Sequence, residues 1–390
     1  MKNLIYLLLL SMTIPSCKKE EARQVNQYTI EQFYTNTRFE GGTFSADETR
    51  LLVGSDETGI FNLYEITLAD GAKKQLTTST VESYYPVDYV PGMSALIYSA
   101  DKGGNEIDHL YLLEDNGKTT DLTPGENNKV SFFKWSEDKK SMFYISNIRD
   151  PKYFDVYKMN IGEWIPTLFY ENKSGLDVNE ISDDEKTLVV SKTVTTSENE
   201  LYLVNKETGT QTELSLPDQK GRYGVSGISK DSKYVFYLTD GGKEFTYLVQ
   251  YDMNSGERKV LYETTWDVMY TFLSEKETYR VIAINEDGKN TIIMQDAASG
   301  KTIDFPAIPD GDILGVEISD SEKLMRLSVG TSKAPNNIYL YNLETKELKK
   351  LTESLNKEIN ADDLVSAEVV RYKSFDGLDI PAIYYKPHQD

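Results

Sequence analysis

The sequence contains one cysteine and two histidines in 390 residues. A single cysteine excludes a disulfide framework within the chain and a thiolate metal cluster. The two histidines, His109 and His388, lie too far apart in the sequence to indicate a histidine metal site. There is also no GxxxxGK[ST] loop to cradle phosphates. We therefore predict no metal and no cofactor.

Acidic residues outnumber basic ones, 63 to 42. The net charge is −21, and acidic and basic residues are interspersed along the chain. Nucleic-acid binding requires a basic stripe that neutralises phosphates, and docking to anionic lipid requires a basic patch. Both are disfavoured, and the composition indicates a solvated acidic surface instead.

Only one long apolar run occurs, and it lies at the N-terminus. Lys2 precedes the apolar residues 4–14 (LIYLLLLSMTI), and Pro15-Ser16 lead to Cys17. The run is too short to span a bilayer and stands where a signal peptide belongs. Small residues ending in cysteine resemble the lipobox of bacterial lipoproteins, which implies lipidation at Cys17; an ordinary signal peptide is the alternative. We expect an exported protein that is lipid-anchored to the cell envelope rather than membrane-spanning.

The rest of the chain is suited to a large β-rich core. Hydrophobic residues make up 39%, including 27 Tyr and 14 Phe. β-branched and aromatic residues are plentiful, while Gly and Asp recur regularly, which favours strands joined by turns.

Internal repeats decide the architecture. An apolar residue, a serine, an acidic turn and a strand recur six times, as in FSADETRLLV at Phe44 and ISDDEKTLVV at Ile181. From Ser136 onward the serines lie 46, 47, 45 and 45 residues apart. A seventh copy, YVPGMSALIYS, uses Pro91-Gly92 in its turn. The serines are Ser45, Ser136, Ser182, Ser229, Ser274 and Ser319.

A second landmark keeps the same period. An apolar pair opens a strand that runs into a polar turn, as in LYLLEDNG from Leu110, and its seven copies start 44 to 47 residues apart. Each unit holds about four short strands, which is the content of a propeller blade. The sequence therefore predicts an all-β, seven-bladed β-propeller. Its blades are 36–79, 83–126, 129–172, 175–218, 220–265, 266–311 and 312–354.

The acidic turns are also candidates for calcium-binding loops. Calcium loops require carboxylates at alternate positions, a fixed Gly and a distal Glu. Turns such as ISDDEK repeat with the blades and lack that pattern. We therefore interpret them as hairpin turns.

The blade motif resembles the Ser-Pro-Asp-Gly type of TolB-like propellers and of the prolyl oligopeptidase family of serine peptidases. The segment 368–387 (EVVRYKSFDGLDIPAIYYKP) resembles the hairpin by which the peptidase chains enter their α/β-hydrolase domain, with strands at 369–373 and 378–385. The sequence and this resemblance together divide the chain into five parts. These are the signal peptide (1–17), a tether and lead-in (18–35), the propeller (36–354), a linker (355–367) and the first hairpin of a hydrolase domain (368–390).

The family's catalytic triad is not expected in this chain. Its serine stands on a G-x-S-x-G elbow, and no such string occurs here. His109 lies in the second blade without a nucleophile, which favours a structural role, and His388 follows the hairpin as exposed chain. The triad is expected in a following domain, so we name no catalytic residue.

The channel should be lined by aromatic residues and arginines. Tyr84, Tyr85, Trp266, Tyr270 and Phe272 precede or begin strands that should line the channel, and blade-to-blade packing is favoured over ligand contact. Arg38, Arg222 and Arg371 are candidates to face the channel and hold a peptide carboxylate, but nothing in their spacing selects among them.

Two functions follow. The resemblance implies the propeller of an exported prolyl oligopeptidase-type peptidase, which limits entry to short peptides and is inactive without its hydrolase domain. The alternative is a stand-alone TolB-like propeller lipoprotein that binds a protein or glycan at the envelope. We favour the first, because a self-contained propeller has no need of the hairpin at 368–387.

Overall fold

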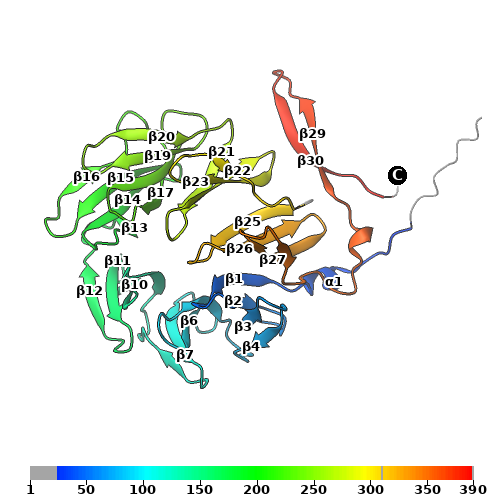
Figure 1. Ribbon diagram of the computed structural model, residues 1–390, viewed down its shortest axis with the longest axis horizontal. Helices are drawn as coiled ribbons and strands as arrows, with labels where there is room; N and C mark the ends of the chain where they lie inside the picture. The colour runs from blue at the N-terminus through cyan, green and yellow to red at the C-terminus, as the bar shows by residue number, and fades with distance from the viewer. Residues whose placement is uncertain (1–23, 309–310, 389–390) are drawn as a thin grey trace, which may run out of the picture.

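The computed structural model describes residues 24–308 and 311–388, and its regular structure is almost entirely antiparallel sheet. Seven four-stranded sheets are arranged around a ring (Figure 1). Each sheet consists of four consecutive strands and forms one blade. The prediction of an all-β, seven-bladed β-propeller is confirmed.

Blades 1 to 4 contain the strands β1 (Phe39–Phe44), β2 (Arg50–Ser55), β3 (Asn62–Thr67), β4 (Lys73–Gln75), β5 (Tyr85–Tyr89), β6 (Ala95–Ala100), β7 (His109–Glu114), β8 (Thr119–Asp121), β9 (Val130–Trp135), β10 (Ser141–Asp150), β11 (Tyr153–Asn160), β12 (Pro166–Tyr170), β13 (Asp177–Ile181), β14 (Thr187–Thr195), β15 (Glu198–Asn205) and β16 (Gln211–Glu213). Blades 5 to 7 contain β17 (Tyr223–Ile228), β18 (Tyr234–Thr239), β19 (Tyr247–Asp252), β20 (Arg258–Tyr262), β21 (Asp267–Leu273), β22 (Tyr279–Glu286), β23 (Lys289–Asp296), β24 (Thr302–Ile303), β25 (Gly311–Ile318), β26 (Leu324–Thr331), β27 (Ala334–Asn342) and β28 (Leu348–Lys350).

Four further elements flank the propeller. The short helix α1 (Ile30–Tyr34) precedes β1, and a 3-10 turn (Ala361–Asp363) follows β28. The strands β29 (Ala367–Lys373) and β30 (Asp379–Tyr385) pair only with each other. They form a hairpin that projects from the ring beside blades 6 and 7 (Figure 1).

The repeated serine holds the turn after the first strand of its blade. Ser182 is 2% exposed, its Oγ donates to the Asp184 carboxylate at 2.6 Å, and the same Oγ accepts from the Thr187 N–H at 2.9 Å. Ser45, Ser136 and Ser229 make the same pair of bonds. The hydroxyl thus forms hydrogen bonds with a backbone N–H and a carboxylate that the tight turn shields from water.

Blades 6 and 7 lack this aspartate, and a glutamate of the next blade replaces it. Ser319 Oγ donates to the Glu48 carboxylate of blade 1 at 3.0 Å, and the Ser321 N–H donates to the same carboxylate at 2.7 Å. In the same way Glu322 of blade 7 accepts from the Lys276 N–H of blade 6 at 2.8 Å. Glu48 and Glu322 both have left-handed backbone, with φ of 52° and 62°.

Among the strands that the structure describes, none is shared between the first and last blades, and other contacts close the ring. Phe39 and Leu51 of blade 1 pack with Ile338 and Leu340 of blade 7. Lys349 Nζ donates to the Leu68 carbonyl at 3.0 Å. Together with the Glu48 contacts, these interactions close the seam between blades 7 and 1.

The core lies between neighbouring blades. Ile97 and Leu110 of blade 2 form one buried cluster with Met142 and Met159 of blade 3. Similar clusters join the other blades. A single blade would expose the apolar side chains on both of its faces to water. These side chains are buried only when neighbouring blades pack together in the ring.

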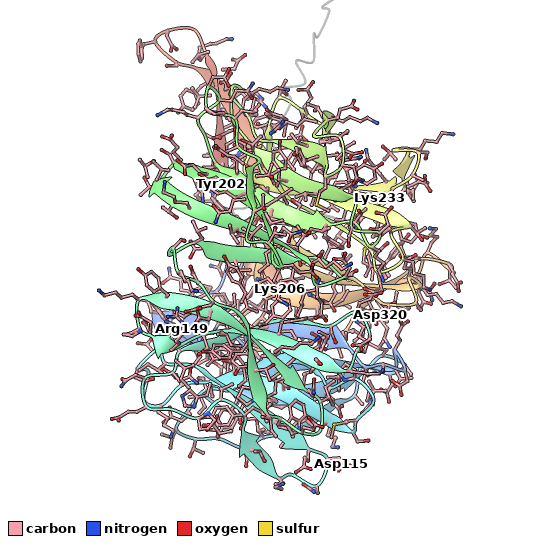
Figure 2. All side chains as sticks on the ribbon, turned by 90° about the vertical axis from the view of Figure 1, so that its left-hand side faces the viewer. Asp115, Arg149, Tyr202, Lys206, Lys233 and Asp320 are labelled. Atoms are coloured by element: carbon pink, nitrogen blue, oxygen red, sulfur yellow. The ribbon has the colours of Figure 1, made fainter. Side chains whose placement is uncertain are left out.

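The ring has two distinct faces. The turns that join second to third strands lie on one face, which we call the hairpin face because β29–β30 contacts two of these turns. The serine turns lie on the other, the serine face. In Figure 2, Arg149 at the end of β10 lies on the left, whereas Lys233 and Asp320 of the serine turns lie on the right.

Candidate functional site

The β29–β30 hairpin is anchored to the hairpin face. Arg371 Nη2 lies 2.6 Å from both carboxylate oxygens of Asp287, in the β22–β23 turn of blade 6. The Ala367 N–H donates to Ser332 Oγ in the β26–β27 turn of blade 7 at 3.0 Å. Ile383 lies against Gly288 in the turn beside Asp287. The hairpin therefore has a defined position over two blades.

The rest of the hairpin is exposed and apolar. Phe375 at its tip has no neighbour that shields it, and Tyr372, Leu378 and Tyr385 are each more than half exposed. Two-stranded hairpins are marginally stable alone, and large exposed apolar side chains mark an interaction surface.

Four blades place a charged side chain, three acidic and one basic, at the same position of the channel wall near the serine face. Lys134, Glu180 and Glu317 of blades 3, 4 and 7 lie two residues before the repeated serine, and Asp88 of blade 2 lies two residues before Val90, which takes the serine's place. Lys134 Nζ lies 3.2 Å from Glu180 and also donates to the Ile181 carbonyl at 3.0 Å, which joins blades 3 and 4. These ion pairs are structural contacts between blades.

Asp88 is the most perturbed group on this wall. Burial raises its pKa to about 6, the negative charge of Glu317 acts in the same direction, and hydrogen bonds from Trp135 and the Tyr89 N–H act against both. Trp135 Nε1 donates to Asp88 at 2.8 Å.

Arg326 occupies the seam side of the channel. Its Nη2 lies 2.8 Å from Glu317 on the neighbouring strand. Its Nε stands 2.9 Å from the position that a Cβ on Gly42 of blade 1 would take. Gly42 also has φ of 120°, so a larger residue there is disfavoured both by its backbone and by Arg326.

The aromatic residues singled out above pack mainly between blades. Tyr84 lies 4.8 Å from Tyr98, ring centre to ring centre, within a cluster shared by blades 1 and 2. Tyr270 and Phe272 pack in the cluster between blades 6 and 7. Tyr85 is 37% exposed and lies 5.2 Å from the Phe61 ring. Trp266 is partly buried.

The three candidate arginines are not equivalent. Arg38 pairs with Asp56 at 2.6 Å, and Arg222 is exposed at the start of β17. Arg371 does not face the channel, because it lies in β29 and pairs with Asp287. The sequence could not show this, since residue 371 and its partner lie 84 positions apart.

His109 is 8% exposed, and its ring nitrogens lie 2.8 Å from the Asp121 carboxylate and 3.0 Å from the Gly125 carbonyl. The structure therefore gives His109 a structural role in blade 2. His388 is partly buried rather than freely exposed, with Nε2 3.3 Å from the Leu364 carbonyl. Within residues 24–308 and 311–388, no hydrogen bond joins a serine hydroxyl to either imidazole.

Cys17, the predicted lipidation site, lies outside the described residues. In the part of the chain that is described, no helix has the length and apolar character needed to cross a bilayer.

The sequence did not reveal the glutamates that bridge the blades. Glu48, Glu277 and Glu322 each stand three residues after a serine of the repeat, and their carboxylates bind backbone N–H groups of the preceding blade. A signal was present, because the turns at Ser274 and Ser319 lack an aspartate two residues after the serine, and the blade next to each in the ring carries such a glutamate.

Comparison with known proteins agrees with this architecture. Residues 87–354 match the family model of the prolyl oligopeptidase N-terminal β-propeller domain. Dipeptidyl aminopeptidase BIII of Pseudoxanthomonas mexicana is 23% identical over 304 residues, covering 75% of this chain and 43% of that protein.

Solved structures show the same fold. A chain from a structural study of two prolyl endopeptidases superimposes with a TM-score of 0.68 at 17% identity, covering 89% of this chain and 54% of that one. Prolyl oligopeptidase B from Galerina marginata gives a TM-score of 0.65 at 15% identity, covering 90% and 56%. The chain thus spans about half the length of the proteins it resembles. Because the family model covers most of the seven blades, the chain belongs to the prolyl oligopeptidase family, as its N-terminal β-propeller domain.

Proposed function

We propose that this chain is the substrate-gating propeller of an exported prolyl oligopeptidase-type serine peptidase that acts on short peptides. The catalytic serine, histidine and aspartate belong to an α/β-hydrolase domain that β29–β30 begins. The observation that carries the proposal is this hairpin, which lies outside all seven blades and is fixed to blades 6 and 7.

The hairpin's surface supports this assignment. Phe375, Tyr372 and Leu378 expose large apolar side chains on a sheet of only two strands. Packing against a larger sheet would bury these groups and pair the open strand edges. The Arg371–Asp287 ion pair would then hold the catalytic domain over the hairpin face.

Substrate size follows from the same placement. A domain seated on the hairpin face would enclose its active site between itself and the ring. Peptides would reach that site only through the narrow channel or through a gap between the domains. The peptidase names of the relatives support peptides as the substrate class.

Export and anchoring belong to the same proposal. Lys2, the apolar residues 4–14 and Cys17 have the order of a lipoprotein signal peptide. A lipid on Cys17 would tether the propeller to the cell envelope through the polar residues that follow.

The experiment is activity-based labelling of the native protein. Antibodies against the propeller would isolate it from cells treated with a fluorophosphonate, which reacts with activated serines. We expect a labelled band larger than the 390-residue chain, with labelling blocked by prior treatment with a peptide aldehyde ending in proline. An unlabelled band the size of this chain, copurifying with a protein or glycan, would support the stand-alone binding propeller instead.

A further inference from the structure

Blades 1 and 5 place an arginine at the same position. Arg38 immediately precedes β1, and Arg222 immediately precedes β17. Each donates its backbone N–H to an aspartate 18 residues further along, Asp56 and Asp240, and both bonds are 2.7 Å long. The two arginines therefore start from the same local structure on the hairpin face.

Their side chains differ. Arg38 turns back onto its aspartate, with Nε 2.6 Å from Asp56 Oδ2, and its guanidinium lies 5.0 Å from the centre of the Phe61 ring. Among the described residues, the Arg222 guanidinium has no ion pair and no hydrogen bond, although Asp240 offers the same carboxylate. The blade does not use this charge for its own stability.

Arg222 borders a cavity of about 730 Å³ on the hairpin face, between blades 4, 5 and 6. This volume lies within the range of small-molecule sites, roughly 300–1,000 Å³. Besides Arg222, its lining includes Thr195, Glu198, Asp240, Asp267 and Met269.

The cavity presents charges of both signs. Asp240 and Asp267 each use one carboxylate oxygen to accept a backbone N–H, from Arg222 and Thr246. In the described part of the chain, the other oxygen of each has no hydrogen-bond partner. Glu198 is compensated by Lys220 at 3.4 Å. A ligand that matches this cavity carries a separated negative and positive charge.

We propose that this cavity binds short peptides by their charged ends, with Arg222 holding the C-terminal carboxylate and the two aspartates facing the N-terminal ammonium. The planar guanidinium matches a carboxylate through two parallel hydrogen bonds. The inference rests on the proposed function, in which short peptides reach this face. It adds Arg222 as the residue that binds their C-terminal carboxylate.

The test is calorimetric titration of the full chain with trialanine, its C-terminal amide and its N-acetyl derivative. We expect the wild type to bind trialanine at millimolar concentration and to bind either blocked peptide more weakly. Loss of a charge-assisted hydrogen bond weakens binding by about tenfold or more. Arg222→Gln should weaken trialanine binding to that extent and leave binding of the amide unchanged.

Arg38→Gln is the matched control, because it removes an arginine from the equivalent blade position and should leave peptide binding intact. The melting curve of Arg222→Gln should match the wild type, because this guanidinium makes no ion pair or hydrogen bond among the described residues, whereas Arg38→Gln loses the ion pair with Asp56. Equal affinity of wild type and Arg222→Gln for trialanine, equal affinity for trialanine and its amide, or no binding at millimolar concentration would overturn the proposal.

The titration involves no catalysis, so the two proposals fail separately. If the native protein is not labelled but still binds trialanine through Arg222, the peptidase proposal fails and the peptide site stands. If the native protein is labelled but trialanine and its amide bind equally, the peptidase proposal stands and the peptide site fails.

Discussion

Replacing Asp88 by asparagine removes a buried acid from the channel wall while keeping its shape. Burial raises the pKa of this carboxyl from 3.8 to about 6, and Glu317 adds to the effect. The folded state therefore holds the proton more tightly than the unfolded chain does. The contribution of Asp88 to stability therefore falls as pH rises through the interval from about 4 to about 6, and this penalty is constant at higher pH.

The magnitude follows from the difference between the two pKa values. A shift from 3.8 to about 6 is roughly two units, and each unit corresponds to about 1.4 kcal/mol. Asp88→Asn should thus gain up to about 3 kcal/mol relative to the wild type between pH 4 and pH 8. A constant offset is superimposed, because the amide cannot accept both the Trp135 and the Tyr89 N–H as the carboxylate does.

Urea unfolding of both proteins at several pH values gives this difference directly, because carboxyls that do not interact with Asp88 contribute equally to both proteins. Asp138→Asn is the control. A hydrogen bond from Ser136 lowers the pKa of the exposed Asp138, so its small effect should have the opposite dependence on pH. A difference between wild type and Asp88→Asn that stays flat from pH 4 to pH 8 would refute the reasoning.

Three further predictions concern the seam, the turns and the anchor. Glu48→Gln weakens the contacts that join blade 1 to Ser319 and Ser321, so the free energy of unfolding should fall by about 1–3 kcal/mol. An unchanged midpoint of urea unfolding would contradict the role of Glu48 in ring closure. Ser182→Ala leaves the Thr187 N–H without its acceptor in a buried turn and should cost about 1–3 kcal/mol in the same assay; a loss below the error of the measurement would show that the hydroxyl is dispensable. Cys17→Ser should move the protein from the detergent-rich to the aqueous phase in phase partitioning of cell extracts, whereas identical partitioning of both proteins would argue against lipidation.

The propeller was predictable because one turn recurs with a fixed period. Ser136 and Ser182 need a partner two residues later, and Asp138 and Asp184 supply it within the same short segment. Such local contacts leave a pattern in the sequence. The seventh copy, around Gly92, was found because Pro91-Gly92 is itself a turn signal, and Gly92 has φ of 72°.

Contacts between blades were not predictable, because their partners are distant in the sequence. Ser319 meets Glu48 across the seam, 271 positions away. Arg38 and Arg222 each precede an aromatic residue that opens the first strand of a blade, yet only the fold shows that one guanidinium is paired and the other borders a cavity. Charge and spacing alone therefore left the candidate arginines undecided.

The most direct test of the central claim is to read the genomic DNA beyond the codon for Asp390. The account predicts an in-frame continuation, or one restored by a single frameshift, that encodes G-x-S-x-G followed by an aspartate and then a histidine. A genuine stop codon followed by unrelated sequence would contradict the peptidase assignment for this product.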